Sequence, residues 1–190
     1  MRVLITIATL PLLTSLPLTA AANSDAPEAS SRCAPQLDQH VRRLNSDEMI
    51  DLCALTAGKT TLVVNTASRC GYTGQFDGLE ALHQRYKDKG LVVVGFPSGD
   101  FRQEASNESD TAQVCFVNYG VTFTVAATDS VRGDSAQPVF AALRQQAPEP
   151  SWNFNKYLIS ADGESVTHFS PNVAPLASPL EAAVKQALAL

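Results

Sequence analysis

Hydrophobic residues in the middle of the chain follow two different periods. Residues 59–67, KTTLVVNTA, and residues 91–97, LVVVGFP, are short apolar runs rich in β-branched side chains, which predicts two buried strands. Between them, residues 75–90 have apolar positions at helical spacing, and Gly90 is placed to end the helix. A strand, a helix and a strand at this spacing predict a βαβ unit with a right-handed crossover.

Shorter patterns on either side predict the remaining elements. They indicate a small hairpin near the N-terminus, two further helices separated by a strand, a second hairpin, and a C-terminal helix with Ser178 as its N-cap and Pro179 at its first position. The expected strands are 40–45, 48–55, 121–127, 154–160 and 164–170, and the expected helices are 109–120 (beginning at Ser109 or Asp110), 135–148 and 178–190. This order predicts an α/β protein with a thioredoxin-like fold, in which helices flank a central mixed sheet and a β-hairpin lies at the N-terminus.

The start of the chain differs in character from the rest. Residues 1–22 begin with Arg2, continue as an apolar stretch and end in three alanines, which is typical of a secretory signal peptide. Residues 23–36 are mostly small and polar and are expected to form a disordered leader, so the folded domain is predicted to cover residues 37–190. We therefore expect a secreted, periplasmic protein without stable membrane insertion.

Composition narrows the possible partners. The chain has 190 residues, of which 45% are hydrophobic, and this is enough for one globular domain with a proper core. Its net charge of -5 gives no electrostatic reason to expect a nucleic acid or an anionic membrane as partner. The three histidines, His40, His83 and His168, have no metal-ligand spacing, so we expect them on the surface and expect no bound cofactor.

The four cysteines differ in their surroundings. An oxidising compartment permits disulfides, and four cysteines allow three full pairings. Cys33 and Cys53 flank the predicted N-terminal hairpin, and a structural disulfide between them is the leading interpretation in a secreted protein. Cys115 falls on the apolar face of a predicted helix and is expected in the core.

Cys70 lies at a position that favours a reactive thiolate. It lies between the first long strand and the helix that follows, and backbone N–H groups at such a position favour a thiolate. The alternative is a small buried hydrophobic side chain, as most free cysteines are. The fourth residue of a C-x-x-C redox motif would be a second cysteine, but here it is Thr73.

Three segments resemble the glutathione peroxidase family. They are the stretch from LVVNTASRCGYT to GFP at residues 62–97, NYGVTF at 118–123 and WNFNKYLI at 152–159, and the likeness extends from about residue 37 to 175. Three motifs in the family's order make the resemblance specific. It implies a thioredoxin-fold peroxidase.

The resemblance also implies the site residues. Cys70 stands at the position of the peroxidatic cysteine or selenocysteine, and Trp152 and Asn153 match two further members of the family's active-site tetrad. The fourth member is a glutamine in GFPCNQF, whereas this chain has GFPSGDF, with Asp100 at the glutamine's position. Ser98 stands where the family resemblance leads us to expect a resolving cysteine in many thioredoxin-dependent members.

The chemistry that these residues imply needs hydrogen-bond donors around a sulfur. A thiolate attacks one oxygen of a hydroperoxide, the O–O bond breaks, and the sulfur becomes a sulfenic acid. The indole N–H of Trp152 and the amide of Asn153 are suitable donors for the thiolate and for the leaving alkoxide. A charged Asp100 about 5 Å from the thiolate would cost about 3 kcal/mol. Asp100 is therefore expected to be turned away, to be protonated and donating, or to slow the enzyme.

We interpret the chain as a cysteine-type, thiol-dependent peroxidase that reduces hydrogen peroxide and organic hydroperoxides. The reductant is expected to be glutathione or a thioredoxin-like protein. One alternative is a thiol-disulfide oxidoreductase, and another is a non-enzymatic binding module that has kept the fold. Only residues 124–151 separate the second and third motifs, a short segment that resembles monomeric members of the family, so we expect a monomer.

Overall fold

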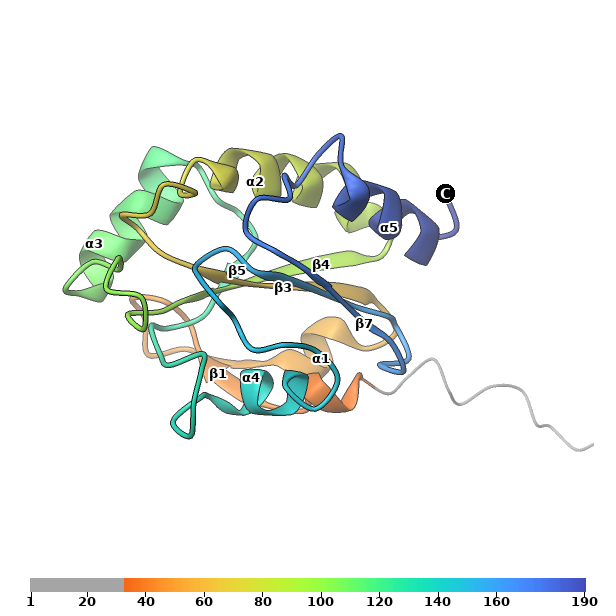
Figure 1. The fold of residues 1–190 in the computed structure, drawn as a ribbon, viewed down its shortest axis with the longest axis horizontal. Helices are drawn as coiled ribbons and strands as arrows, with labels where there is room; N and C mark the ends of the chain where they lie inside the picture. Colours follow the sequence, from red (N-terminus) through yellow and green to blue (C-terminus); the bar gives the residue numbers. More distant parts are fainter. Residues whose placement is uncertain (1–32) are drawn as a thin grey trace, which may run out of the picture.

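The structure of the protein, a computed structural model, describes residues 33–190 (Figure 1). The predicted signal peptide, residues 1–22, and residues 23–32 of the predicted leader lie outside the described residues.

A five-stranded mixed sheet forms the centre of the molecule, with the strand order β5-β4-β3-β6-β7. β3 (Thr60–Thr66) pairs in parallel with β4 (Leu91–Pro97), as the predicted βαβ unit requires. β4 also pairs in parallel with β5 (Thr124–Val125). β3 pairs antiparallel with β6 (Lys156–Ile159), which forms an antiparallel hairpin with β7 (Val166–Phe169). The predicted thioredoxin-like fold is confirmed.

Helices cover both faces of this sheet (Figure 1). On one face lie α2 and α5, and on the other lie α1, α4 and the N-terminal hairpin, which is antiparallel. None of the helices within residues 33–190 is both long enough and apolar enough to cross a bilayer. The bounds are η2 (Pro35–Leu37), β1 (His40–Arg42), β2 (Met49–Asp51), α1 (Leu52–Thr56), α2 (Gln75–Tyr86), η3 (Lys87–Lys89), α3 (Glu108–Ala112), the π-helical η4 (Gln113–Asn118), α4 (Pro138–Leu143) and α5 (Pro179–Ala187).

The core has two halves because side chains alternate across each strand. In β3, Leu62 and Val64 pack with α2 and α5, whereas Val63 packs with α4 on the opposite face. All seven residues of β3 and all seven of β4 are buried, which explains why neither strand shows the apolar–polar alternation of a half-buried strand. The α-helix between them ends at Tyr86 and continues as the 3₁₀ helix η3, which ends at the predicted Gly90, in the left-handed conformation at φ 98°.

Two differences between the predicted and the observed elements concern the residue at which a helix begins. Residues 52–55 were expected to continue a strand, but they form α1, because the Asp51 side chain accepts a hydrogen bond from the Ala54 N–H and caps a helix there. The helix expected to begin at Ser109 or Asp110 is capped earlier by Asn107, whose side chain accepts from the Asp110 N–H.

Residues 33–36, which precede the predicted start of the domain at residue 37, are packed against it. Ala34 and Gln36 are buried, and the Gln36 side chain donates to the Gly163 carbonyl at 3.1 Å. A side chain at Gly163 would place its Cβ 2.8 Å from Ala34, so only glycine fits this turn between β6 and β7. Cys33 forms the predicted disulfide with Cys53.

Removing this disulfide should lower the stability of the domain. It closes a sequence separation of 20 residues, so replacing both Cys33 and Cys53 by serine should reduce the free energy of unfolding by about 2 to 4 kcal/mol. Urea unfolding of the double variant and of the oxidised wild type measures the difference. A reductant should destabilise the wild type and leave the double variant unchanged. Equal stability of the two oxidised proteins would contradict the prediction.

Candidate active site

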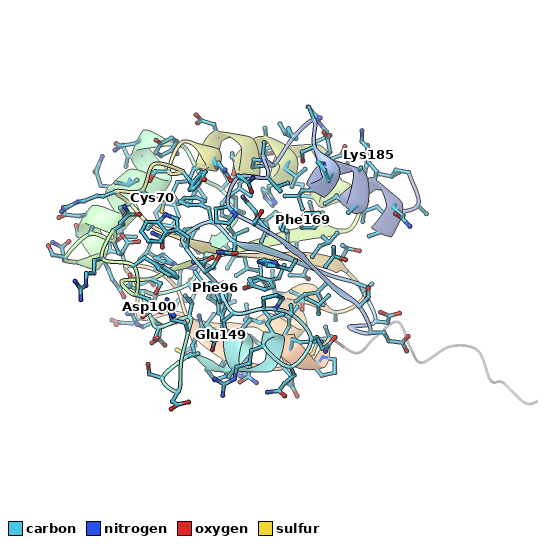
Figure 2. The ribbon with its side chains drawn as sticks, viewed as in Figure 1. Cys70, Phe96, Asp100, Glu149, Phe169 and Lys185 are labelled. Carbon is cyan, nitrogen blue, oxygen red and sulfur yellow. A yellow bond between two sulfur atoms is a disulfide. The ribbon has the colours of Figure 1, made fainter. Side chains whose placement is uncertain are left out.

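Cys70 lies in a series of tight turns between β3 and α2. The Thr73 N–H donates to the Cys70 carbonyl at 3.0 Å, and the Gln75 N–H donates to the Tyr72 carbonyl at 2.8 Å. These turns bring the chain from the end of β3 at Thr66 to the first residue of α2 at Gln75. Figure 2 shows Cys70 at one end of the sheet, on the side covered by α2.

The Cys70 side chain is a free thiol that is 8% exposed. Its sulfur accepts a hydrogen bond from the Tyr72 N–H at 3.4 Å. Because α2 begins five residues later, at Gln75, this donor belongs to the turn and not to the helix terminus that the sequence suggested. A backbone N–H aimed at the sulfur is nevertheless the kind of group that stabilises a thiolate.

Thr73 holds the turn in place of a second cysteine. Its hydroxyl accepts from the Cys70 N–H at 2.9 Å and lies within hydrogen-bonding distance of the Ala67 carbonyl, at 3.0 Å, and the Cys70 carbonyl, at 2.8 Å. The position that completes a C-x-x-C motif in a disulfide oxidoreductase is thus occupied here by a buried structural residue. Cys70 has no partner thiol in the same turn.

The WNFN segment is bound to the end of β3 by Asn65. The Asn65 side-chain amide donates to the Trp152 carbonyl at 3.0 Å and accepts from the Asn155 N–H at 2.9 Å. The Asn65 carbonyl accepts from the Phe154 N–H at 2.6 Å. Segments about ninety residues apart in sequence therefore meet at the strand end that leads to Cys70.

Phe154 shows that this connection is tight. It adopts φ 63°, a conformation that is costly for a residue with a side chain, and it is fully buried. Its ring packs edge-on against Phe76 of α2, with the centroids 5.3 Å apart. The packing and the backbone hydrogen bond to Asn65 hold Phe154 in this conformation. The position of Phe154 in turn constrains the backbone of the two preceding residues, Trp152 and Asn153.

Trp152 and Asn153 occupy different environments. Trp152 is 40% exposed, and its ring lies against Phe101 with the centroids 5.4 Å apart. Asn153 is fully buried, and its Nδ2 donates to Gln103 Oε1 at 3.1 Å. Its Oδ1 is buried without a hydrogen-bond partner among the described residues. Neither residue forms a hydrogen bond with the Cys70 sulfur within residues 33–190, where Tyr72 is the sulfur's donor.

Asp100 is turned away, which is the first of the three arrangements expected. Its carboxylate accepts from the Val131 N–H at 2.7 Å and from the Ser130 hydroxyl at 3.1 Å. In Figure 2 it lies toward the α4 side of the sheet, apart from Cys70. Ser98 is buried, and its hydroxyl accepts from the Asp100 N–H at 3.2 Å. Asp100 therefore binds the loop at residues 130–131. It does not act as the fourth member of the active-site tetrad that the resemblance implied.

Sequence reasoning missed Asn65, Thr73 and Gln103. An asparagine inside an otherwise apolar buried strand was a visible signal for Asn65, because a buried amide needs partners. Gln103 gave no such signal, since a glutamine in a polar loop is ordinary. It binds Asn153 through its side chain, and its carbonyl accepts from the Arg69 N–H at 2.8 Å.

One of the other titratable candidates, His168, contacts the WNFN segment, because its Nε2 lies 2.8 Å from Asn155 Oδ1. Cys115 is 1% exposed, as predicted, and burial raises the pKa of its thiol to about 12. His83 and His168 are half-buried, so the surface prediction holds only for His40; burial lowers the pKa of both. Cys33, Asp38 and Cys53 have metal-binding atoms close together, but the two sulfurs are joined in the disulfide.

Comparison with known proteins decides the family. The family model described as glutathione peroxidase matches residues 37–144. The chain belongs to the glutathione peroxidase family. It is 45% identical over 119 residues to a glutathione peroxidase-like peroxiredoxin of Schizosaccharomyces pombe, covering 60% of this chain and 75% of that protein. It is 43% identical over 124 residues to a glutathione peroxidase of Lactococcus lactis, covering 62% and 79%.

Solved structures agree with this assignment to the glutathione peroxidase family. The T. cruzi GPX1 crystal structure matches with a TM-score of 0.62 and 26% identity, over 82% of this chain and 95% of that one. The apo form of Trgpx matches with a TM-score of 0.61 and 30% identity over the same shares. A secreted disulfide oxidoreductase of Mycobacterium tuberculosis, homologous to DsbE of E. coli, matches at 17% identity with a TM-score of 0.55, covering 82% and 98%, and shows the fold alone.

The hydroxyl of Thr73 should be important for stability in this peroxidase. Thr73→Val keeps the side-chain shape but leaves the buried Cys70 N–H without its acceptor, which should cost about 1 to 3 kcal/mol of unfolding free energy. Thr73→Ser retains the oxygen and serves as the matched control, with a smaller loss. Urea unfolding of the three proteins measures this. If Val is tolerated as well as Ser, the hydroxyl does not hold the turn.

Proposed function

We propose that Cys70 is the peroxidatic residue of this thiol-dependent peroxidase. The observation that carries the proposal is a free thiol whose sulfur accepts a backbone N–H, at the end of the strand to which the WNFN segment is bound. Membership of the glutathione peroxidase family supports the same assignment. The substrates are hydrogen peroxide and organic hydroperoxides.

The first step oxidises the sulfur by two electrons. The Cys70 thiolate attacks the terminal oxygen of ROOH, the O–O bond breaks, and the leaving RO⁻ takes a proton to become ROH. The Tyr72 N–H stabilises the sulfur's negative charge before the attack. Trp152 and Asn153 are the proposed donors to the leaving oxygen once peroxide is bound. The product on the protein is the Cys70 sulfenic acid.

Thiols then return the sulfur to its starting state. One thiol condenses with the sulfenic acid to give a mixed disulfide and water, and a second thiol releases Cys70 by thiol–disulfide exchange. Glutathione or a thioredoxin-like protein is the proposed reductant. Cys115 is buried, and this burial raises the pKa of its thiol to about 12, so we expect an external thiol to attack first. A Cys70–Cys115 disulfide formed by peroxide would instead show that the π-helical segment η4 (Gln113–Asn118) opens.

We propose secretion to the periplasm, supported by the signal-like sequence of residues 1–22 and by the Cys33–Cys53 disulfide, because disulfides persist in oxidising compartments. The monomeric state stays a prediction. Thr73 in the C-x-x-C position argues against a disulfide oxidoreductase, and insulin reduction should be negligible.

Replacing Cys70 should abolish peroxide consumption without unfolding the protein. The exchange to serine removes the nucleophile but changes one atom, so the circular dichroism spectrum and the unfolding midpoint should remain. Cys115→Ser is the matched control: it should consume the first equivalent of peroxide at the wild-type rate, because that step needs only Cys70. Peroxide decay followed by stopped flow gives both rates. Retained consumption in the folded Cys70→Ser variant would refute the assignment.

A further inference from the structure

The loop that follows β4 carries two polar residues, Asp100 and Gln103, whose side chains point in different directions. Asp100 binds the loop at residues 130–131, whereas Gln103 binds Asn153. Between them, Arg102 adopts φ 58°, the left-handed region that a residue with a side chain rarely occupies. Its N–H closes a turn onto the Gly99 carbonyl at 2.9 Å. This reversal of the backbone places Gln103, and not Asp100, against the candidate site.

Gln103 joins both parts of that site. Its carbonyl accepts from the N–H of Arg69, the residue next to Cys70, at 2.8 Å. Its side-chain Oε1 accepts from Asn153 Nδ2 at 3.1 Å. One half-buried residue thus connects the turn that carries the thiol with the buried amide of the WNFN segment.

The Asn153 amide has one polar atom left over. Its Oδ1 is fully buried and has no partner among the described residues, which is unusual for a buried amide. If both amides turn over, the hydrogen bond to Gln103 persists with donor and acceptor exchanged, and Nδ2 becomes the free atom. An N–H donor is the group that a thiolate or a departing alkoxide needs. A carboxylate or an alkyl group at position 103 could not support that orientation.

We propose that Gln103 is a positioning residue for Asn153, holding its amide so that Nδ2 is available to the negative charge that forms at Cys70. The inference rests on the proposed function of Cys70. Gln103 thus supplies an amide beside Asn153, whereas Asp100, at the position where the resemblance places a glutamine, faces the other way.

A double-variant cycle on Gln103 and Asn153 tests this. Gln103→Ala should slow the reaction of Cys70 with hydrogen peroxide about 10-fold, the effect of one lost hydrogen bond to a charged group. In an Asn153→Ala background, the same substitution should have no further effect, because Gln103 acts through Asn153. Gln146→Ala, at an exposed glutamine after α4, is the matched control and should react as the wild type does.

A second readout does not depend on peroxide. The rate of iodoacetamide alkylation, localised to Cys70 by mass spectrometry, is measured against pH for each variant. The midpoint of this profile should move to higher pH in Gln103→Ala and should not move further in the double variant. A purely structural role of Gln103 would not move it. If Asn153→Ala fails to fold, Asn153→Ser takes its place in the cycle.

Two results would overturn the inference. One is an unchanged peroxide rate and alkylation midpoint in Gln103→Ala, and the other is an effect of Gln103→Ala that adds fully to that of Asn153→Ala. A wild-type protein that consumes no peroxide would refute the proposed function instead. The alkylation cycle would still decide whether Gln103 acts through Asn153 on Cys70.

Discussion

The arrangement of the site depends on the hydrogen bonds of one buried amide, Asn65. It lies at the end of the central strand β3, is fully buried, and binds the backbone of residues 152–155 through its side chain and its main chain. Burying an amide is unfavourable unless each of its groups is bonded, so the loss of any one of these contacts would leave a buried polar group without a partner. They fix the distance between the turn that carries Cys70 and the segment that carries Asn153, and they hold Phe154 in its left-handed conformation.

The same strand end explains why this thioredoxin-like fold supports peroxide chemistry better than disulfide exchange. A disulfide oxidoreductase needs a second thiol one turn after the first, but Thr73 occupies that position and stabilises the turn through three hydrogen-bond contacts. Cys70 is left with a backbone donor and no neighbouring thiol in the turn. Such a sulfur can be oxidised to a sulfenic acid, which an external thiol then reduces. The fold is shared with disulfide oxidoreductases, so the difference in chemistry lies in the turn and not in the sheet.

The sequence allows the frame to be predicted, but not the contacts made by loops. Strands β3 and β4, helix α2 and the β6–β7 hairpin follow from periodicity and turn residues, and the Cys33–Cys53 pairing followed from their position around a hairpin. The direction of Asp100 did not, because it depends on the left-handed turn at Arg102 and on the Val131 N–H, which donates to the Asp100 carboxylate. The contact between Asp100 and Val131 joins residues 31 positions apart, and no local pattern encodes it. For the same reason Gln103 could not be predicted as a site residue from the sequence, although it contacts Asn153, which was predicted.

The central claim is that peroxide oxidises Cys70 and leaves the rest of the protein intact. The most direct measurement is peptide mapping by mass spectrometry after one equivalent of hydrogen peroxide, with dimedone present to trap sulfenic acid. The account predicts a dimedone adduct on Cys70, an unmodified Cys115 thiol and an intact Cys33–Cys53 disulfide. A free Cys70 thiol in protein that has consumed the peroxide, with the oxidation located on another residue, would contradict it.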